Sequence, residues 1–156
     1  MIEEENGYII RIELQADSSY DADRELNVTS NIALALKQCK HELAEYFAGT
    51  RSGFSVPINP IGTPFQMKVW DELLRINYGE FISYKELAER IGNPKAVRAV
   101  GGANGKNPLM IVIPCHRVIG ANGALVGYGG GGVKNKEWLI NLEKQNREQL
   151  KIMNCL

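Results

Sequence analysis

Apolar residues recur at helical spacing in the first third of the chain and predict an amphipathic helix over residues 28–47. Gly49 follows, and glycine is the residue type that most often ends a helix. Cys39 lies on the apolar stripe and is expected in the core, whereas His41 lies off the stripe and is expected at the surface. The stripe consists of Val28, Ile32, Ala35, Leu36, Cys39, Leu43 and Phe47.

Shorter patterns surround this helix. Residues 7–14 predict a strand, and the polar residues 17–27 predict a loop. Residues 49–60 are rich in Gly, Pro and Ser and show no period, which is typical of a linker. We therefore expect a small N-terminal α/β unit with its linker over residues 1–60 and a second domain over residues 61–156.

Helix start signals follow the linker. Thr63, Pro64 and Gln66 combine a capping hydroxyl, a proline at the first helical position and a glutamine that can complete a capping box. They predict a helix that ends at about Ile76, before a turn at Tyr78–Gly79.

A second capping box, from Ser83 to Glu86, opens a short helix that Gly92 ends, and Asn93–Pro94 begins the next helix. Two short helices joined in this way are typical of a helix-turn-helix. Such pairs also occur as simple packing units, so the pattern alone leaves DNA binding open.

The formal net charge is zero, but charge is divided unevenly along the chain. Residues 1–53 hold ten acidic and five basic residues, whereas residues 91–136 hold six basic residues and no acidic one. A basic region of this kind is expected where a protein meets a polyanion, although it can also be ordinary solvated surface. Its basic residues are Lys95, Arg98, Lys106, Arg117, Lys134 and Lys136.

The second helix of the pair has small side chains between Ala96 and Gly102 that offer almost no hydrogen-bond donors. Sequence-specific recognition of base edges requires Arg, Lys, Asn or Gln. The composition suits close approach to a backbone or a shallow groove instead, with Arg98 as the one long charged side chain.

The strongest candidate for chemistry is Cys115, which His116 and Arg117 follow directly. The apolar run Leu109–Ile113 predicts a short buried strand that stops at Pro114. A thiol with an ordinary pKa of about 8.5 needs a base or nearby cations to react, and both neighbours are suitable. A lone cysteine after a strand can also be a core residue. Because neighbours on a strand face opposite sides, we expect a bend or a bridging water between Cys115 and His116.

Residues 120–132 are dominated by glycine and contain Tyr128. No Gly-Lys-Ser/Thr sequence closes the segment, so it does not match a phosphate-binding loop. We interpret it as the flexible wall of a substrate pocket with one aromatic face. A final helix is predicted from about Asn135, with Trp138, Leu139 and Leu142 buried.

Three cysteines and two histidines show no metal-like spacing, so no metal site is predicted. The N-terminus does not resemble a signal peptide, and no apolar run approaches the length of a membrane span. We expect a protein of a reducing compartment, cytoplasmic or, in a eukaryote, nuclear. Cys155 has no evident role.

The sequence resembles a known family, the O6-alkylguanine-DNA alkyltransferases, also called methylated-DNA-protein-cysteine methyltransferases. The resemblance centres on Pro114–Val118 and runs from about Thr63 to Glu143. It implies an α/β (α+β) fold, with a small N-terminal unit resembling ribonuclease H and a mainly helical C-terminal winged helix-turn-helix domain. Further matching segments are Ile82–Tyr84, Gly92–Lys95, Arg98–Ala103, Asn107–Pro108 and Lys136–Leu139.

The resemblance implies a monomeric DNA repair enzyme that needs no cofactor. It would bind duplex DNA in the minor groove, flip out a guanine alkylated at O6 and move the alkyl group irreversibly to Cys115 in a single turnover. The O4 atom of alkylated thymine is a second position that such a site could dealkylate.

Catalytic roles come with the resemblance. Cys115 matches the nucleophile, His116 the base that activates it through a water, and Glu143 the carboxylate that orients the histidine. Tyr84 matches the tyrosine that crowds the adjacent phosphate and donates a proton to the leaving guanine. Asn107 matches the asparagine that ties the helix-turn-helix to the active-site loop.

Plain structural alternatives stay open for three of these residues. Glu143 could be a solvated partner of Arg147 one turn further along the helix. Tyr84 could be a surface residue at a helix start, and Asn107 could be part of a turn.

The DNA surface and the substrate pocket are assigned in the same way. Arg98 matches the finger that fills the gap left by the flipped base. Tyr128 and Gly129 would line the alkylguanine pocket, with Met110 and Val118 near the alkyl group. The residues expected to contact DNA are Arg98, Tyr84, Lys95, Ala99, Gly101, Lys106 and Arg117.

The chain departs from the family pattern at Gly129, where some members carry a hydroxyl residue, and by one residue inserted before Lys136. Three other interpretations compete: a non-catalytic relative that binds alkylated guanine, a winged-helix regulator and a Cys-His hydrolase. The presence of Cys115 counts against the first and the donor-poor second helix against the second. The adjacency of Cys115 and His116 counts against the third.

Overall fold

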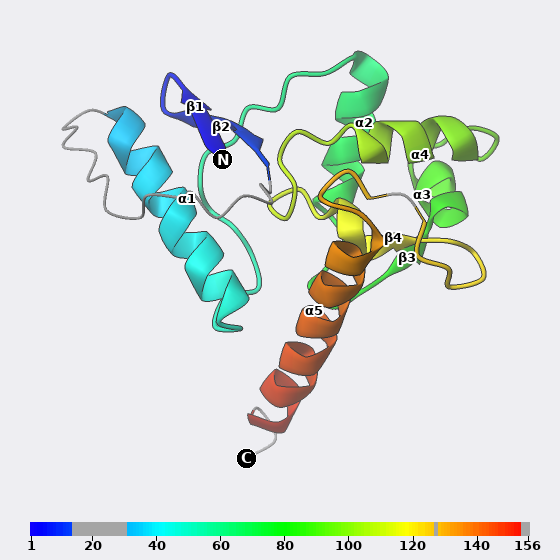
Figure 1. Ribbon diagram of the computed structural model, residues 1–156. Helices are drawn as coiled ribbons and strands as arrows, with labels where there is room; N and C mark the ends of the chain where they lie inside the picture. The colour runs from blue at the N-terminus through cyan, green and yellow to red at the C-terminus, as the bar shows by residue number, and fades with distance from the viewer. Residues whose placement is uncertain (14–30, 127, 154–156) are drawn as a thin grey trace.

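The computed structural model describes residues 1–13, 31–126 and 128–153 (Figure 1). The predicted loop 17–27, the first positions of the predicted helix and Cys155 lie outside the described residues. The helices are α1 (Asn31–Phe47), α2 (Pro64–Leu73), α3 (Tyr84–Arg90), α4 (Val97–Gly105), the 3₁₀ helix η1 (Cys115–Arg117) and α5 (Val133–Met153). The strands are β1 (Ile2–Glu5), β2 (Tyr8–Ile12), β3 (Ile82–Ser83) and β4 (Val118–Ile119).

The chain begins with an antiparallel hairpin of β1 and β2, against which α1 packs. The strand predicted at residues 7–14 corresponds to β2, whereas β1 is an addition to the prediction. Asn6 and Gly7 join the strands with φ angles of 54° and 87°. Positive φ at both positions is the requirement of a tight hairpin turn, which Asn-Gly meets at low cost. The run of glutamates in β1 gives no apolar alternation and hides the strand.

Helix α1 presents Ala35, Cys39 and Tyr46 to the core, so the prediction that Cys39 is buried is confirmed. His41 is exposed, as predicted, and lies 3.3 Å from Glu45. The buried face lies slightly to one side of the predicted stripe, because Phe47 is partly exposed while Tyr46 is fully buried.

A buried carboxylate joins α1 to the predicted linker. Glu42 is 2% exposed and accepts hydrogen bonds from the main-chain N–H groups of Ser55 (2.9 Å) and Val56 (3.1 Å). The Gln38 side chain donates to it at 2.8 Å. Burial would raise the pKa of Glu42, but these hydrogen bonds lower it to about 2. The segment that follows α1 is therefore fixed to the helix.

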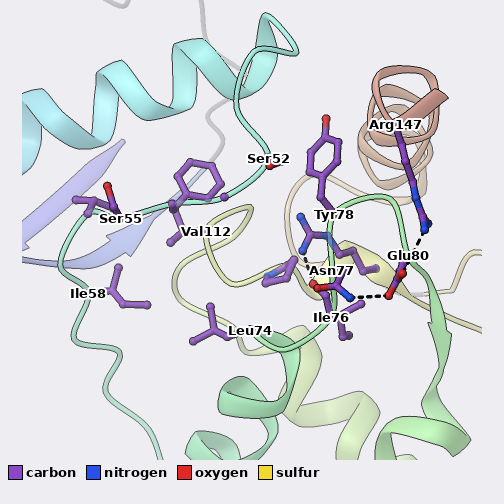
Figure 2. A pocket seen from close by; sticks show the side chains of 15 residues that line it. Ser52, Ser55, Ile58, Leu74, Ile76, Asn77, Tyr78, Glu80, Val112 and Arg147 are labelled. Atoms are coloured by element: carbon purple, nitrogen blue, oxygen red, sulfur yellow. Dashed lines mark hydrogen bonds and ion pairs between the residues drawn. The ribbon is translucent and has the colours of Figure 1, made fainter. Parts of the chain in front are cut away.

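The linker also joins the two halves of the molecule. Ile58 pairs with Ile9 of β2, and Ile12 pairs with Leu109 far along the chain. The buried apolar residues of the N-terminal and C-terminal parts form one continuous cluster. A cavity of about 740 Å³ separates Ser52–Ile58 from the loop that contains Tyr78 and Glu80 (Figure 2).

The predicted start signals of α2 and α3 are confirmed, with one difference. Thr63 and Gln66 form a complete capping box on α2. Ser83 accepts from the main-chain N–H of Glu86 at 3.0 Å, but the Glu86 carboxylate pairs with Arg90 at 2.8 Å. The second capping box is therefore only half formed, because a basic partner one turn away competes for the glutamate.

Helices α3 and α4 pack against each other and against α2, which confirms the predicted helix pair. Gly92 lies between them with a φ angle of 73°. Helix α4 begins at Val97, later than predicted, because Asn93 O accepts from Ala96 N (2.9 Å) in a separate turn. Trp70 of α2 donates to the carbonyl of Ala103 at 2.9 Å and fixes α4 on its inner side.

The prediction of a strand at Leu109–Ile113 is wrong. The segment is buried, but Ile113 N donates to Leu109 O at 2.8 Å, which closes a tight turn. Ile111 has a φ angle of 76°. A run that is apolar at every position carries no period, so it does not distinguish a strand from a turn buried on all sides.

Helix α5 buries Lys136, Leu139, Ile140 and Glu143 on one face. The predicted burial of Leu139 is confirmed, and Leu142 is half-buried. The prediction for Trp138 is wrong: it is 53% exposed and touches Phe47 with a ring separation of 5.8 Å. Lys136 and Glu143 thus occupy core positions, which the apolar pattern of the helix does not predict for charged residues. None of the described helices is long and apolar enough to cross a membrane.

We predict that Glu42→Ala lowers the free energy of unfolding by about 2–4 kcal/mol, because main-chain N–H groups of the linker lose a charged acceptor. The folded-state pKa of Glu42 is about 2, below the ordinary value of about 4.3. Its contribution is therefore complete above about pH 4.3 and is lost as the pH falls toward 2. Urea unfolding at several pH values measures this loss.

Glu45→Ala is the matched control, because Glu45 lies on the same helix and pairs with Arg51 at the surface. It should shift the unfolding midpoint only slightly. Equal losses for both variants would show that burial of Glu42 is unimportant.

Candidate active site

Cys115 is the first residue of η1, and only 4% of it is exposed. Its N–H donates to Ile113 O (2.8 Å), and the side chain of Asn104 donates to its carbonyl oxygen (3.2 Å). These contacts fix the main chain of the cysteine on both sides. The thiol therefore has a defined position at the end of the tight turn.

The electrostatic setting of Cys115 keeps the thiol protonated at rest. Burial raises its pKa, and a hydrogen bond with Asn107 and the charge of Lys136 compensate only in part. A neutral thiol is a weak nucleophile, so the reaction requires a base that removes the proton.

His116 is suited to be that base. Its Nε2 lies 2.8 Å from Glu143 Oε1, and because an ionised carboxylate only accepts, Nε2 carries the proton. Nδ1 then has a free lone pair, and it is buried with no hydrogen-bond partner among the described residues. Burial lowers the pKa of His116, although Glu143 opposes this. The imidazole is therefore neutral with one accepting nitrogen available.

The Glu143 carboxylate is fully buried and surrounded by donors. Arg117 donates through Nη2 to Oε1 (2.9 Å) and through Nε to Oε2 (3.0 Å). Tyr46 donates to Oε1 at 2.7 Å, and Gly79 N donates to Oε2 at 2.9 Å. Burial alone would raise the pKa of Glu143, but the hydrogen bonds from His116 and Arg117 lower it to about 2. The carboxylate stays ionised and orients the histidine.

The alternative that Glu143 is a solvated partner of Arg147 is wrong, since Arg147 pairs with Glu80 at 3.2 Å. Arg117 does not lie on the DNA-facing surface predicted for it. It is 6% exposed, and its Nη1 donates to the carbonyl of Ile76 at 2.6 Å. Its charge is neutralised by Glu143 inside the protein.

Asn107 lies just after α4 and links that helix to the cysteine turn. Its Nδ2 donates to Ile113 O (2.8 Å), and its Oδ1 accepts from Leu109 N (2.9 Å). This placement agrees with the link expected between the helix-turn-helix and the active-site loop. Both contacts lie within the segment that leads to Cys115, so the role of Asn107 as a link stays a prediction.

Tyr84 and Lys136 lie near each other and near Cys115. Tyr84, the first residue of α3, donates to the carbonyl of Val126 at 3.2 Å. Lys136 is fully buried, donates to the same carbonyl at 3.1 Å and lies 5.5 Å from the centre of the Tyr84 ring. Burial lowers the pKa of Lys136, while Cys115 raises it. Lys136 is thus a cation that could stabilise a thiolate.

The pocket residues predicted from the resemblance separate into two groups. Met110 and Gly129 line a cavity of about 460 Å³ together with Asn107 and Lys106. A Cβ at Gly129 would lie 2.8 Å from the carbonyl oxygen of Gly105, so a larger residue requires a shift of the main chain. Glycine at position 129 therefore fits the close approach of the Gly105 carbonyl oxygen.

Tyr128 and Val118 are buried. The Tyr128 hydroxyl has no hydrogen-bond partner in the described part of the chain. Burial is the larger cause that raises the pKa of Tyr128, and the nearby Cys115 raises it further. This hydroxyl stays protonated and could donate to a bound molecule. Val118 belongs to β4 and pairs with Ile82 of β3.

The predicted DNA surface is exposed on α4 and around it. Lys95, Arg98, Ala99 and Lys106 are exposed, and Gly101 is half-buried against the Tyr84 ring. Within the described ranges, no acidic side chain pairs with Lys95, Arg98 or Lys106. These positive charges remain available to an external anion.

Two residues of the site were not singled out by the sequence. Lys136 stands among the basic residues and in the matching segment Lys136–Leu139 with no catalytic role assigned to it, and no role is assigned to Tyr46. A signal existed for Tyr46, since it lies two helical turns after Cys39 on the same face of α1. Its polar partner, Glu143, lies almost a hundred positions further along and gives no local signal.

We predict that Glu143→Gln lowers the free energy of unfolding by about 3–5 kcal/mol, because Arg117 would become a buried charge without a counter-ion. The wild-type carboxylate, with a pKa of about 2, contributes fully above about pH 4.3 and less as the pH falls below it. Denaturant unfolding measures the change. Glu80→Gln, which breaks an exposed pair with Arg147, is the control and should have little effect.

Comparison with known proteins identifies the family of the chain. The family model described as 6-O-methylguanine DNA methyltransferase, DNA binding domain, matches residues 64–145 of this chain. A second family model, described as 6-O-methylguanine DNA methyltransferase, ribonuclease-like domain, matches residues 1–60.

Individual relatives extend over most of the chain. The constitutive methylated-DNA–protein-cysteine methyltransferase of Bacillus subtilis is 47% identical over 149 residues, which is 92% of this chain and 88% of the relative. The methylated-DNA–protein-cysteine methyltransferase of Mycobacterium leprae is 48% identical over 128 residues, 82% of this chain and 76% of the relative. A crystal structure of Mycobacterium tuberculosis OGT in complex with DNA superposes with a TM-score of 0.78 at 41% identity, covering 93% of this chain and 86% of that one. The resemblance is confirmed, and the chain belongs to the 6-O-methylguanine DNA methyltransferase family.

Proposed function

We propose that this protein repairs DNA by direct reversal, transferring the alkyl group from O6 of guanine to Sγ of its own Cys115. The observation that carries the proposal is the buried His116 ring, whose Nε2 is fixed on Glu143 while Nδ1 has no partner among the described residues. A neutral base with one free nitrogen beside a buried thiol is suited to removing the thiol proton.

The proposed reaction begins with proton transfer from the thiol of Cys115, through a bridging water, to Nδ1 of His116. The resulting imidazolium is stabilised by the ionised Glu143 carboxylate. The thiolate, close to the positive charge of Lys136, attacks the alkyl carbon. A sulfur–carbon bond forms as the carbon–oxygen bond breaks, and the electron pair of that bond leaves with guanine.

The leaving guanine needs a proton, and Tyr84 is proposed to supply it. Its hydroxyl lies 3.4 Å from the ammonium group of Lys136, so a transient tyrosinate would have a cation beside it. The unpaired hydroxyl of Tyr128 is available for a further hydrogen bond to the base. Gly129 leaves only main-chain groups to contact the substrate oxygen.

Duplex DNA is the proposed form of the substrate. The small exposed surface of α4 suits close approach to the minor groove, and Arg98 is the side chain long enough to replace a flipped base. Lys95 and Lys106 are proposed to contact phosphates. The protein is proposed to act as a monomer in the cytoplasm. Two further points stay predictions: the division of the chain into domains between residues 60 and 61, and activity on O4 of alkylated thymine.

We predict that duplex DNA with a labelled methyl group on guanine O6 transfers one label per protein molecule, and that the label maps to the peptide containing Cys115. A thioether is a poor leaving group, so product should reach a plateau with a single exponential and no steady state. Cys115→Ser should abolish transfer while binding to methylated DNA persists, because the hydroxyl is a far weaker nucleophile.

Cys39→Ala serves as the control and should accept label normally. Cys39 is buried on the side of α1 that faces the core, and burial raises its pKa to about 11. Several turnovers in excess substrate without added thiol would overturn the mechanism. Label on another cysteine would overturn the assignment of Cys115.

We predict that Arg98→Ala slows transfer from duplex DNA by about ten-fold or more while transfer from the free O6-methylguanine base changes little. Only the duplex requires unstacking, which costs a few kcal/mol. Single-turnover rates on both substrates measure this. Lys37→Ala, which removes an exposed charge on α1, should leave both rates unchanged. Equal losses on the two substrates would exclude Arg98 from base flipping.

A further inference from the structure

The hydroxyl of Tyr46 lies inside the candidate active site although the residue belongs to the N-terminal part of the chain. It is fully buried and donates to Glu143 Oε1 at 2.7 Å. The hydroxyl oxygen of Tyr46 also lies 3.4 Å from His116 Nε2. None of the steps proposed above assigns a role to this group.

Packing fixes the direction in which the hydroxyl points. The ring of Tyr46 lies 5.6 Å from that of Phe47, 5.5 Å from that of Phe54 and 5.8 Å from that of Tyr78. A ring packed on these sides has little freedom to rotate. Burial, and to a smaller extent the charge of Glu143, also raises the pKa of Tyr46, so the hydroxyl keeps its proton. Tyr46 is therefore a fixed donor and not an adaptable one.

A fixed donor on Oε1 constrains the carboxylate that holds the histidine. Arg117 donates to both oxygens of Glu143, and the N–H of Gly79 holds Oε2, so Oε1 is the oxygen at which Tyr46 adds a constraint. Tyr46 adds a donor from a different helix and leaves the remaining direction at Oε1 to His116. The hydroxyl also stabilises the negative charge and thereby weakens the pull of Glu143 on a His116 proton.

We propose that Tyr46 is a positioning residue for alkyl transfer: its hydroxyl fixes Glu143 and thereby keeps His116 oriented and neutral. Through this contact α1 of the N-terminal part takes part in the chemistry at Cys115. The inference rests on the proposed function.

The groups that face His116 come from three elements and set the expected pH dependence. They are Glu143 and Lys136 from α5, Arg117 from η1, and Tyr46 from α1. Removing the Tyr46 hydroxyl leaves the charges of the other three groups in place and leaves Glu143 less stabilised. His116 should then hold a proton more tightly, so a higher pH is needed to produce the neutral base.

The test compares full-length wild type with Tyr46→Phe, which retains the packed ring. Single-turnover rates are measured with saturating O6-methylguanine duplex between about pH 5 and pH 9, the range in which histidine titrates. We expect transfer at neutral pH to be about ten-fold slower, with the acidic limb of the profile displaced to higher pH. The affinity for DNA should stay within about two-fold of wild type, because a general base and its support act on the chemical step.

Tyr78→Phe is the matched control. Tyr78 belongs to the same aromatic cluster and contacts the Arg117 guanidinium with its ring, but its hydroxyl pairs with Asn146 and not with Glu143. Figure 2 shows Tyr78 and Arg147 beside the cavity. This variant should retain the wild-type pH profile.

A second variant separates chemistry from packing. Replacing Tyr46 by 3-fluorotyrosine makes the hydroxyl a stronger donor, so the acidic limb should move to lower pH than in wild type. Loss of thermal stability in Tyr46→Phe with an unchanged rate and pH profile would overturn the proposal, as would the same profile for all four proteins. If wild type itself transfers no alkyl group to Cys115, the proposed function fails as well, which is a distinguishable result.

Discussion

The buried carboxylate of Glu143 is the group on which the rest of the structure depends. An ionised carboxylate without water is costly unless donors surround it. Its donors come from three separate places, namely Tyr46 on α1, Gly79 in the loop before β3, and the pair His116 and Arg117 in η1, while Glu143 itself lies on α5. Satisfying one charge thus requires the N-terminal helix, the loop and the reactive segment to assemble around α5. The contacts that stabilise Glu143 consequently hold together both the fold and the candidate active site.

This arrangement changes the chemical role of the charges around Cys115. Neighbouring cations in the sequence suggest a thiolate at rest, but the charge of Arg117 is neutralised by Glu143, and His116 is neutral. Lys136 is the buried cation that acts on the sulfur, and it offsets the effect of burial only in part. A neutral, buried thiol reacts poorly with stray electrophiles. The sulfur therefore stays unreactive until its proton is removed.

Local features of the fold could be predicted from the sequence, and long-range ones could not. The Thr63 cap and the turn at Gly92 depend on residues a few positions apart, so their signals are complete within the sequence. Asn6–Gly7 also carried a hairpin signal. In contrast, the burial of Lys136 and the link between Tyr46 and Glu143 depend on which helix faces meet in space. The family resemblance supplied roles for Cys115 and its neighbours that periodicity could not supply.

The 3₁₀ geometry of η1 explains how consecutive residues can serve one reaction. On a strand, Cys115 and His116 would face opposite sides, whereas in a 3₁₀ helix successive side chains diverge by about 120°. That angle is still too wide for a direct thiol–imidazole contact, which agrees with a neutral His116 whose Nδ1 has no partner among the described residues. It also lets His116 and Arg117 reach the same carboxylate while Cys115 faces Lys136. The proposed reaction therefore uses a bridging water, since the imidazole is held by Glu143 and does not turn toward the sulfur.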